Sequence, residues 1–364
     1  MNILGLIRES KSGIEPVSYY RVGLPLEAIN RLTNHEATSY SQKSMASMFR
    51  ACLQNDKDPA IALEGYDIVV LSRLFHEDGA IEFIEGVHEN GGIVVFDTDD
   101  DLSEDHRHID GRGWEFVNMI RYVDAVTVST QHLARKVHEW VGRRAAVLPN
   151  HLHCKWFAEE SLKHKKKFDN LTIGVIGTKT HYNDWLYLEG VFERLSKKHD
   201  VTILCAGFQP DYLEEYEYLP PVPYAHYPRL MRQFDIVCCA LDPDDMFNHA
   251  KSAIKALEAM CSARTIDGRV AGAVPVCTNM PVYNHVVSHN NTGLLVNNDD
   301  WYEALDMLIQ DSKIRRRLAY KGHRWVKNNR DITRSYKKWL SVYDSLAIQR
   351  QQLGPYPAST GAYQ

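Results

Sequence analysis

Apolar and polar positions alternate in blocks that predict β-strands and helices following one another along the chain. In the first half we expect strands at 2–7, 36–40, 67–72, 93–96, 125–129 and 146–149, with helices at about 23–33, 42–54, 81–90 and 130–142. In the second half we expect strands at 171–177, 201–206, 235–240, 273–277 and 292–296, and long basic helices to about residue 347. Strands that alternate with helices at this spacing predict parallel, doubly wound sheets.

The length of the chain fits two such sheets. It has 364 residues, of which 44% are hydrophobic and 24% charged, and a net charge of −5, which gives no support to a large nucleic-acid-binding face. A basic, apolar-poor segment at 163–167 is interpreted as a linker. We therefore expect a first Rossmann-like domain at 1–165, a second Rossmann-like domain at 166–330, a C-terminal helix at 331–348 and a flexible tail at 349–364.

The cysteines and the apolar runs bear on location. Seven scattered cysteines without a CxxC pair predict buried, reduced thiols rather than a disulfide framework or a zinc site. The N-terminal apolar run meets Arg8 too early for a signal peptide, and no apolar run approaches membrane-spanning length. These features predict a cytoplasmic protein with at most peripheral membrane contact.

The segment 245–260 carries the most chemistry. Ile254, Leu257 and Cys261 recur at i, i+3 and i+7, which predicts a helix with one apolar face. Two cations and a carboxylate, Lys251, Lys255 and Glu258, recur at i, i+4 and i+7 on a neighbouring face. A line of this kind at the start of a helix suits an anionic ligand.

A diphosphate is the anion that this helix would suit. Free N–H groups and the helix dipole attract an anion to a helix N-terminus, and Lys251 and Ser252 in the first turn would add a charge and a hydroxyl. Glu258 lies where a ribose would follow the phosphates. The alternative is an amphipathic surface helix with a Lys–Glu pair.

A second phosphate candidate follows the strand at 171–177. Gly177 allows close approach of the backbone, and Thr178, Lys179 and His181 offer donors. A plain strand-to-helix turn with Asp184 as its N-cap fits equally well.

Two loops in the first half end in polar side chains. Asp97, Asp99, Asp100 and Asp101 follow an apolar strand and predict either a DxD metal site, a capped acidic turn, or a metal-free site for sugar or acceptor hydroxyls. The first loop contains Gly13 and ends near Arg21, which could reach across a cleft.

Several blocks in order resemble retaining GT-B glycosyltransferases of the group 1 type, in their bacterial and phage branch. The blocks are Gly177-Thr178 with His181 and Asp184, Tyr227-Pro, Asn248-x-x-Lys251-Ser252-x-x-Lys255-x-x-Glu258, Gly272-x-x-Pro275, and Thr292-Gly-Leu-Leu-Val with Trp301. The resemblance covers about 170–330 well and the first half only loosely. It implies an α/β GT-B fold, with two Rossmann-like domains facing a central cleft and the C-terminal helix packing back on the first domain.

The resemblance also implies roles for these residues. Lys251 and Lys255 would face the donor diphosphate, Glu258 the ribose, and Asn248 the sugar or β-phosphate. Two departures stand out: Ala250 occupies the position of a second glutamate in the wider family, and residues 262–271 lengthen the link to the Gly-x-Pro turn.

The implied activity is transfer of a sugar, with retention of configuration, from a UDP- or GDP-sugar to a hydroxyl of a glycan or lipid-linked glycan, as in polysaccharide biosynthesis. It would need no metal or other cofactor, with Asp99 and Asp100 on the acceptor side beside Arg21 and Gly13. One alternative is a phage-type enzyme that glucosylates hydroxymethylated DNA bases, with Arg135, Lys136, Arg143 and Arg144 as a local basic strip. Others are a metal-dependent GT-A transferase using the Asp97–Asp99 pair, and a degenerate sugar-nucleotide-binding or scaffold protein.

Overall fold

The chain forms two compact units. The computed structural model describes residues 1–10, 13–45, 47, 63–72, 80–103 and 113–354. Met1–Pro149 and Ile332–Gln364 make up one unit, and Asn150–Asp331 the other. The division after Pro149 differs from the boundary expected at 165, because α7 (Cys154–Leu162) packs against α10 (Tyr227–Met231) and α12 (Ile254–Cys261) of the second unit.

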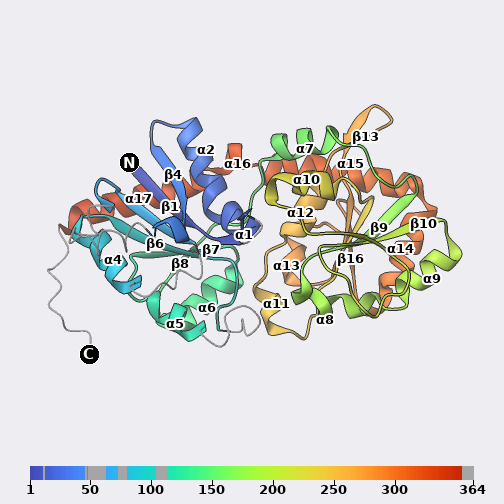
Figure 1. The fold of residues 1–364 in the computed structure, drawn as a ribbon, viewed down its shortest axis with the longest axis horizontal. Coiled ribbons are helices and arrows are strands. Elements are labelled where there is room, and N and C mark those ends of the chain that lie inside the picture. Colours follow the sequence, from blue (N-terminus) through green and yellow to red (C-terminus); the bar gives the residue numbers. More distant parts are fainter. Residues whose placement is uncertain (11–12, 46, 48–62, 73–79, 104–112, 355–364) are drawn as a thin grey trace. The chain divides into compact units, whose positions relative to one another are not determined.

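The first unit is built on a parallel sheet of the order β4-β1-β5-β6-β7-β8. Its strands are β1 (Asn2–Ile7), β4 (Glu36–Ser41), β5 (Ile68–Ser72), β6 (Ile93–Thr98), β7 (Ala125–Val128) and β8 (Ala145–Val147). A short hairpin, β2 (Glu9–Ser10) and β3 (Gly13–Ile14), follows β1. Figure 1 shows α4 (Ala80–Glu89), α5 (Gly113–Met119) and α6 (Gln131–Val141) on one face of the sheet and α2 (Leu24–Leu32) on the other. The predicted strands of this half are confirmed.

The helix expected at about 23–33 begins earlier than predicted. Helix α1 (Pro16–Ser18) continues through a π-helical turn at Tyr19–Gly23 into α2. The wider π turn adds a residue to the repeat, so that Tyr20, Arg21 and Val22 are all buried, a spacing that a 3.6-residue period does not predict. Of the helix expected at 42–54, residues 42–45 and 47 are helical, and the remainder lies outside the described residues.

The C-terminal helices belong to the first unit. Helix α16 (Ile332–Ser335) contacts α2, and α17 (Lys337–Leu353) contacts α2 and β6 and buries Trp339 and Tyr343. The prediction that the C-terminal helix packs back on the first domain is therefore confirmed. Helix α17 extends to Leu353, into the segment expected to be a tail, and residues 355–364 lie outside the described residues.

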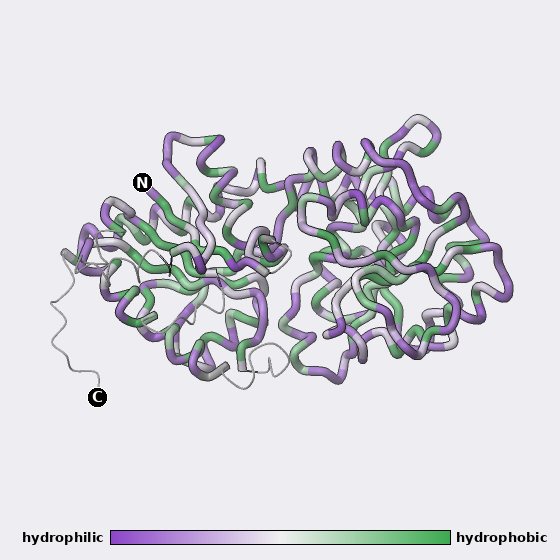
Figure 2. The backbone as a smooth tube through the Cα atoms, in the orientation of Figure 1, coloured by the Kyte–Doolittle hydropathy of each residue, from purple (hydrophilic) through white to green (hydrophobic). Residues whose placement is uncertain are grey.

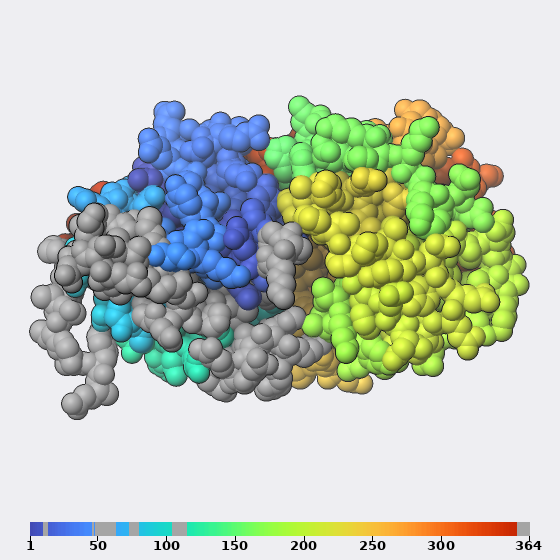
Figure 3. All heavy atoms as spheres, in the orientation of Figure 1, coloured from blue at the N-terminus to red at the C-terminus, as the bar shows by residue number. Residues whose placement is uncertain are grey.

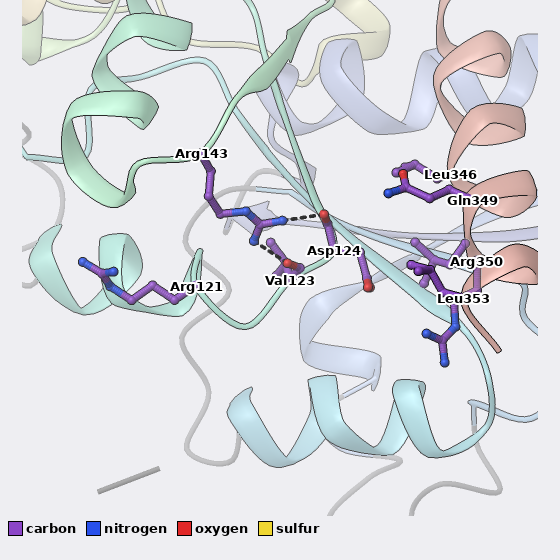
Figure 4. Close-up of a pocket in the computed structure, with 9 residues that line it drawn as sticks. Arg121, Val123, Asp124, Arg143, Leu346, Gln349, Arg350 and Leu353 are labelled. Carbon is purple, nitrogen blue, oxygen red and sulfur yellow. Dashed lines mark hydrogen bonds between the residues drawn. The ribbon is translucent and has the colours of Figure 1, made fainter. Parts of the chain in front are cut away.

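A pocket of about 350 Å³ lies between α17 and the amino ends of β6 and β7 (Figure 4). Arg121, Arg143 and Arg350 line it, but their guanidinium groups do not converge on one point. Arg143 donates to the backbone carbonyls of Ile120, Val123 and Asp124 and so fastens the turn before β7. We interpret this pocket as packing around the C-terminal helix.

The second unit repeats the architecture with the order β11-β10-β9-β12-β15-β16, and all its neighbouring strands are parallel. Its strands are β9 (Leu171–Ile176), β10 (Val201–Ala206), β11 (Glu217–Leu219), β12 (Ile236–Cys239), β15 (Val274–Thr278) and β16 (Leu294–Val296). Figure 1 shows α7, α10, α12 and α15 (Ser312–Asn329) on one face, and α8 (Tyr182–Trp185) and α9 (Val191–Lys198) on the other. Figure 2 shows the central strands of both units as apolar segments, as expected for strands buried on both faces.

The core on the α8–α9 face is aromatic. Trp185, Phe192 and Trp301, the last from α14 (Trp301–Gln310), pack with Ile173 and Val175 of β9. On this face, α8 continues as a 3₁₀ turn at Leu186–Leu188, and α9 follows as a separate helix. Gly190 separates them, because its positive φ of 70° turns the chain before α9 begins.

The lengthened link at 262–271 forms a hairpin, β13 (Arg264–Ile266) and β14 (Arg269–Ala271), which projects from the second unit (Figures 1 and 3). Its two-residue turn is Asp267-Gly268, and both residues have a positive φ, of 50° and 72°. Arg316 of α15 pairs with Asp267 at 3.0 Å, and the Tyr320 hydroxyl donates to the carbonyl of Ile266. The insertion is therefore an ordered element fastened to α15.

Candidate functional site

The candidate donor site lies at the carboxyl ends of β9 and β12. These two strands are neighbours, whereas their following strands β10 and β15 lie on opposite sides of the pair. The order of strands therefore reverses between β9 and β12, which is where parallel α/β sheets bind ligands. Gly177 follows β9, and the loop from Asp242 to Ser252 follows β12.

The helix expected to begin before Lys251 is in fact two helices. Helix α11 (Met246–Ala250) ends at Lys251, whose ψ of 158° is extended, and α12 begins only at Ile254. Lys251 and Ser252 therefore lie in a bend between the two helices. The prediction that they lie in the first turn of a helix is wrong. A break of three residues leaves the spacing of charges and apolar residues intact, so the periodicity could not indicate it.

The bend is held from a distant part of the chain. The Asn150 side-chain amide donates to the Ser252 hydroxyl at 2.8 Å, and Asn150 is 5% exposed. Asn150 was not singled out from the sequence, because a lone asparagine after a strand carries no pattern. The Ser252 hydroxyl thus accepts a hydrogen bond within the second unit in the ligand-free protein.

Lys255 occupies the first turn of α12 and contacts the loop after β9. Its ammonium nitrogen lies 2.6 Å from the Nε2 atom of His181. A Cβ atom at position 177 would come within 2.8 Å of His181 Cδ2 and 3.2 Å of Lys255 Nζ. Gly177 therefore allows the close approach of these two side chains to the end of β9, in addition to any approach of a ligand.

A carboxylate that the sequence offered as an N-cap and as part of the first block of the resemblance, with no assigned role in ligand binding, lies at the centre of the site. Asp184 is 1% exposed and lies within α8, where it caps no helix. Its Oδ2 atom accepts from His181 Nδ1 at 2.6 Å and lies 3.5 Å from Lys251 Nζ. Its Oδ1 atom accepts from the Asn248 amide at 2.6 Å and from the backbone N–H of Asp242 at 2.9 Å.

Asn248, which we expect to contact the sugar or β-phosphate, donates to Asp184 in the ligand-free protein. It is completely buried, and its amide nitrogen also donates to the carbonyl of Asp242 at 3.0 Å. The Asn248 side chain thus fastens α11 to the loop after β12. Ala250 is also completely buried; it occupies the position where the family that this sequence resembles has a second glutamate.

Burial and mutual repulsion shape the charges in the site. Burial, aided by the charge of Lys251, lowers the pKa of Lys255 from 10.5 to about 8. Burial and the charge of Lys255 lower the pKa of His181 to about 3, so this ring is neutral at physiological pH. Burial alone would raise the pKa of Asp184, but the hydrogen bond from His181 and the charge of Lys251 hold it well below its usual range.

Three other predicted residues surround this network. Thr178 and Lys179 are exposed at the start of the loop, where the Thr178 hydroxyl lies 2.8 Å from that of Thr180. Glu258 is 3% exposed and forms a hydrogen bond with Tyr227, whose pKa is raised well above its usual value by burial and by Glu258. Glu258 is therefore held at the base of the site by a partner from the Tyr227-Pro block.

The predicted acceptor-side residues lie in the first unit. Arg21 is 2% exposed and donates to both carboxylate oxygens of Asp97, at 2.9 and 2.7 Å, and to the carbonyl of Leu148. Asp97 also accepts from the Thr127 hydroxyl at 2.6 Å. The structure thus places Arg21 inside the unit, fastened to the first residue of the candidate Asp97–Asp99 metal pair.

The remaining acidic side chains of that loop have different surroundings. Asp99 is 5% exposed, Asp100 is partly exposed, and Asp101 pairs with Lys136 at 3.3 Å. Gly13 pairs with Ser10 in the β2–β3 hairpin after β1. Among the residues that the structure describes, no group of three or more His, Cys, Asp or Glu side chains is arranged to hold a metal ion.

Comparison with known proteins finds similarity in structure alone. No family model and no curated protein matches the sequence. HepE from Anabaena, solved with UDP and glucose, is similar with a TM-score of 0.67 at 14% identity, covering 95% of this chain and 100% of the other. The chain has the GT-B fold.

Two further GT-B structures cover nearly the whole chain. An alpha-glucosyltransferase solved with UDP and a 13-mer DNA containing a HMU base has a TM-score of 0.66 at 12% identity, covering 94% of this chain and 98% of the other. Sucrose-phosphate synthase from Thermosynechococcus elongatus has a TM-score of 0.64 at 11% identity, covering 97% and 98%. The fold class predicted from the sequence is therefore confirmed. In the described part of this GT-B chain, no helix is long and apolar enough to cross a membrane.

Proposed function

We propose that this protein transfers a glycosyl group, with retention, from a nucleoside-diphosphate sugar to a hydroxyl acceptor. The observation that carries the proposal is the pair Lys251 and Lys255 beside the first turn of α12, at the strand-order reversal of the second unit. Two cations and the N–H groups of a helix start are suited to a diphosphate. HepE, whose fold is similar, was solved with UDP.

The chemistry depends on stabilising the leaving diphosphate. As the bond from the anomeric carbon to the phosphate oxygen breaks, its electron pair goes to the diphosphate, and the acceptor oxygen bonds to the carbon while its proton is released. Lys251 and Lys255 would neutralise the charge that develops on the diphosphate. In this proposal Glu258 contacts the ribose, Thr178 and Lys179 line the phosphate side of the loop, and Asp99 and Asp100 belong to the acceptor side.

A glycan or lipid-linked glycan is the acceptor class that we favour. The DNA alternative has support from the similar alpha-glucosyltransferase, which was solved with DNA. The basic strip that would serve DNA binding is partly engaged, however, because Lys136 pairs with Asp101 and Arg143 donates to three backbone carbonyls. Binding of duplex DNA that weakens steeply with salt would favour DNA over a glycan.

The test is a panel of UDP-, GDP- and ADP-sugars with glycan and hydroxymethylated-DNA acceptors. We expect donor hydrolysis or transfer with one donor class, and a loss of about 100-fold in kcat/KM for Lys251→Ala and for Lys255→Ala. Lys197→Ala is the matched control, because Lys197 forms only an exposed pair with Glu193 on α9. Wild-type rates in both site variants would contradict the proposal, and binding of a donor without any turnover would favour a degenerate sugar-nucleotide-binding protein.

A further inference from the structure

The two oxygens of the Asp184 carboxylate have separate partners. Oδ1 accepts from the Asn248 amide and from the backbone N–H of Asp242, which are parts of the scaffold after β12. Oδ2 faces His181 Nδ1 and Lys251 Nζ, which face the candidate donor site. One buried carboxylate thus joins the segment after β9 to the loop after β12 that bears Lys251, and it is linked to Lys255 of α12 through His181.

The same contacts determine which nitrogen of His181 carries the proton. A carboxylate oxygen only accepts hydrogen bonds, so Nδ1 must be protonated to donate to Asp184 Oδ2. Because the ring is neutral, Nε2 is then bare and accepts from the ammonium of Lys255, 2.6 Å away. Lys255 is held in place by a neutral acceptor that a phosphate oxygen can replace.

We propose that Asp184 is the positioning residue of the donor site, orienting Lys251 directly and Lys255 through the tautomer of His181. This role rests on the proposed function for its ligand, a nucleoside diphosphate. The orientation of Lys251 and Lys255 by Asp184 rests on contacts that are present in the ligand-free protein. The site is assembled before the ligand arrives, which lowers the cost of ordering two long side chains on binding.

The decisive variant is Asp184→Asn, because the amide must choose an orientation. Two N–H donors, from Asn248 and Asp242, require an oxygen at the Oδ1 position. The NH₂ group then occupies the Oδ2 position and faces His181 Nδ1. His181 must leave Nδ1 bare and move its proton to Nε2, where the N–H opposes the ammonium of Lys255.

The first measurement is made on the ligand-free protein. Side-chain ¹⁵N spectra of histidine report which ring nitrogen is protonated, and a His181→Gln variant assigns the resonance. We expect Nδ1–H in the wild type with no titration near pH 6.5, and Nε2–H in Asp184→Asn. A wild-type ring that is protonated on Nε2, or that titrates near pH 6.5, would overturn the proposal even if Asp184→Asn does not fold.

The second measurement is the affinity for UDP by calorimetry. We expect Asp184→Asn to bind UDP at least tenfold more weakly at pH 7. Asp211→Asn is the matched control and should stay within twofold, because the exposed Asp211 carboxylate accepts from the hydroxyl of Tyr182, which like Asp184 belongs to α8, and has no other hydrogen bond among the described residues. An unchanged affinity together with an unchanged tautomer in Asp184→Asn would overturn the proposal.

The pH dependence separates positioning from loss of folding. The charged or titratable groups around Lys255 are Lys251, Asp184, His181, Glu258 and Cys239. Asp184 raises the pKa of Lys255, so its neutralisation should move the alkaline loss of UDP affinity to lower pH. A wild type that binds no nucleoside diphosphate would refute the proposed function, whereas the tautomer measurement would still decide the role of Asp184.

Discussion

The ammonium of Lys255 lies 2.6 Å from the Nε2 atom of His181, a neutral partner, and not against a carboxylate. A buried cation without a carboxylate in hydrogen-bond contact is costly, and this cost is why its pKa falls to about 8. In the proposed function, an incoming diphosphate would supply the missing negative charge. Several measurable properties follow from this pair.

The affinity for UDP should fall at alkaline pH. Lys255 must be charged to attract the diphosphate, and its pKa in the ligand-free protein is about 8, so affinity should be insensitive to this group below pH 8 and fall about tenfold per pH unit above it. Titration calorimetry between pH 6 and 9 measures this. Lys255→Met should bind weakly at all these values with no alkaline decline, and a decline that persists in Lys255→Met would assign it to another group.

Lys255→Met should also stabilise the fold. The pKa of Lys255 is lowered from 10.5 to about 8, which corresponds to about 3 kcal/mol of destabilisation at pH 7, where the lysine is charged in both states. That cost is relieved as the pH rises from 8 toward 10.5, so the wild type approaches the variant there. After loss of the His181 hydrogen bond, we expect a net gain of about 1–2 kcal/mol at pH 7 by urea unfolding. A less stable variant would show that burial of this cation is fully compensated.

Gly177→Ala and Gly207→Ala should separate function from folding. The new Cβ at 177 meets side chains and no backbone atom, namely His181 Cδ2 at 2.8 Å and both Lys255 Nζ and the buried Trp185 Cζ2 at 3.2 Å, so we expect donor KM to rise about tenfold with a smaller loss of stability than Gly207→Ala causes. The new Cβ at 207 meets the backbone oxygen of Gly177 at 2.3 Å and the φ there is 89°, so we expect a loss of more than 2 kcal/mol in stability. Equal effects of the two variants on stability would contradict this distinction.

Arg21→Met should act on stability. Arg21 and Asp97 form a buried, doubly hydrogen-bonded ion pair, and removing one partner leaves an uncompensated carboxylate, at a cost of about 3–5 kcal/mol. Adding Asp97→Asn to Arg21→Met should recover part of that loss. Unfolding in urea measures the difference. A stable Arg21→Met protein with a raised acceptor KM would instead support the acceptor-side role.

The acidic loop should serve the acceptor without a metal. Both carboxylate oxygens of Asp97 accept hydrogen bonds from Arg21 or Thr127. Asp97 is therefore engaged within the unit and poorly placed to bind a metal ion together with Asp99. We therefore expect transfer to survive EDTA, and Asp99→Asn and Asp100→Asn to raise acceptor KM severalfold while donor hydrolysis stays unchanged. Loss of activity in EDTA with recovery on adding Mn²⁺ would favour the metal-dependent alternative.

The sequence by itself determined the two parallel sheets and placed Lys251 and Lys255 of the candidate donor site close together after a strand of the second sheet. Strands such as 67–72 and 171–177 are continuous apolar runs because both faces of a parallel sheet are covered, and this composition is visible without coordinates. Lys251 and Lys255 could be singled out because residues near in sequence stay near in space whichever helix they occupy. Their places at the end of the sheet were therefore predictable.

Only the tertiary structure decided which side chains meet. Asp184 and Asn248 are 64 positions apart, and Arg21 and Asp97 are 76 apart, so neither spacing nor periodicity could pair them. The bend at Lys251 and the π turn at Tyr19–Gly23 also escaped prediction, because each keeps the apolar residues buried while changing the helical phase. The pattern of burial is encoded locally, whereas the partners of buried charges are selected by the packing of distant strands.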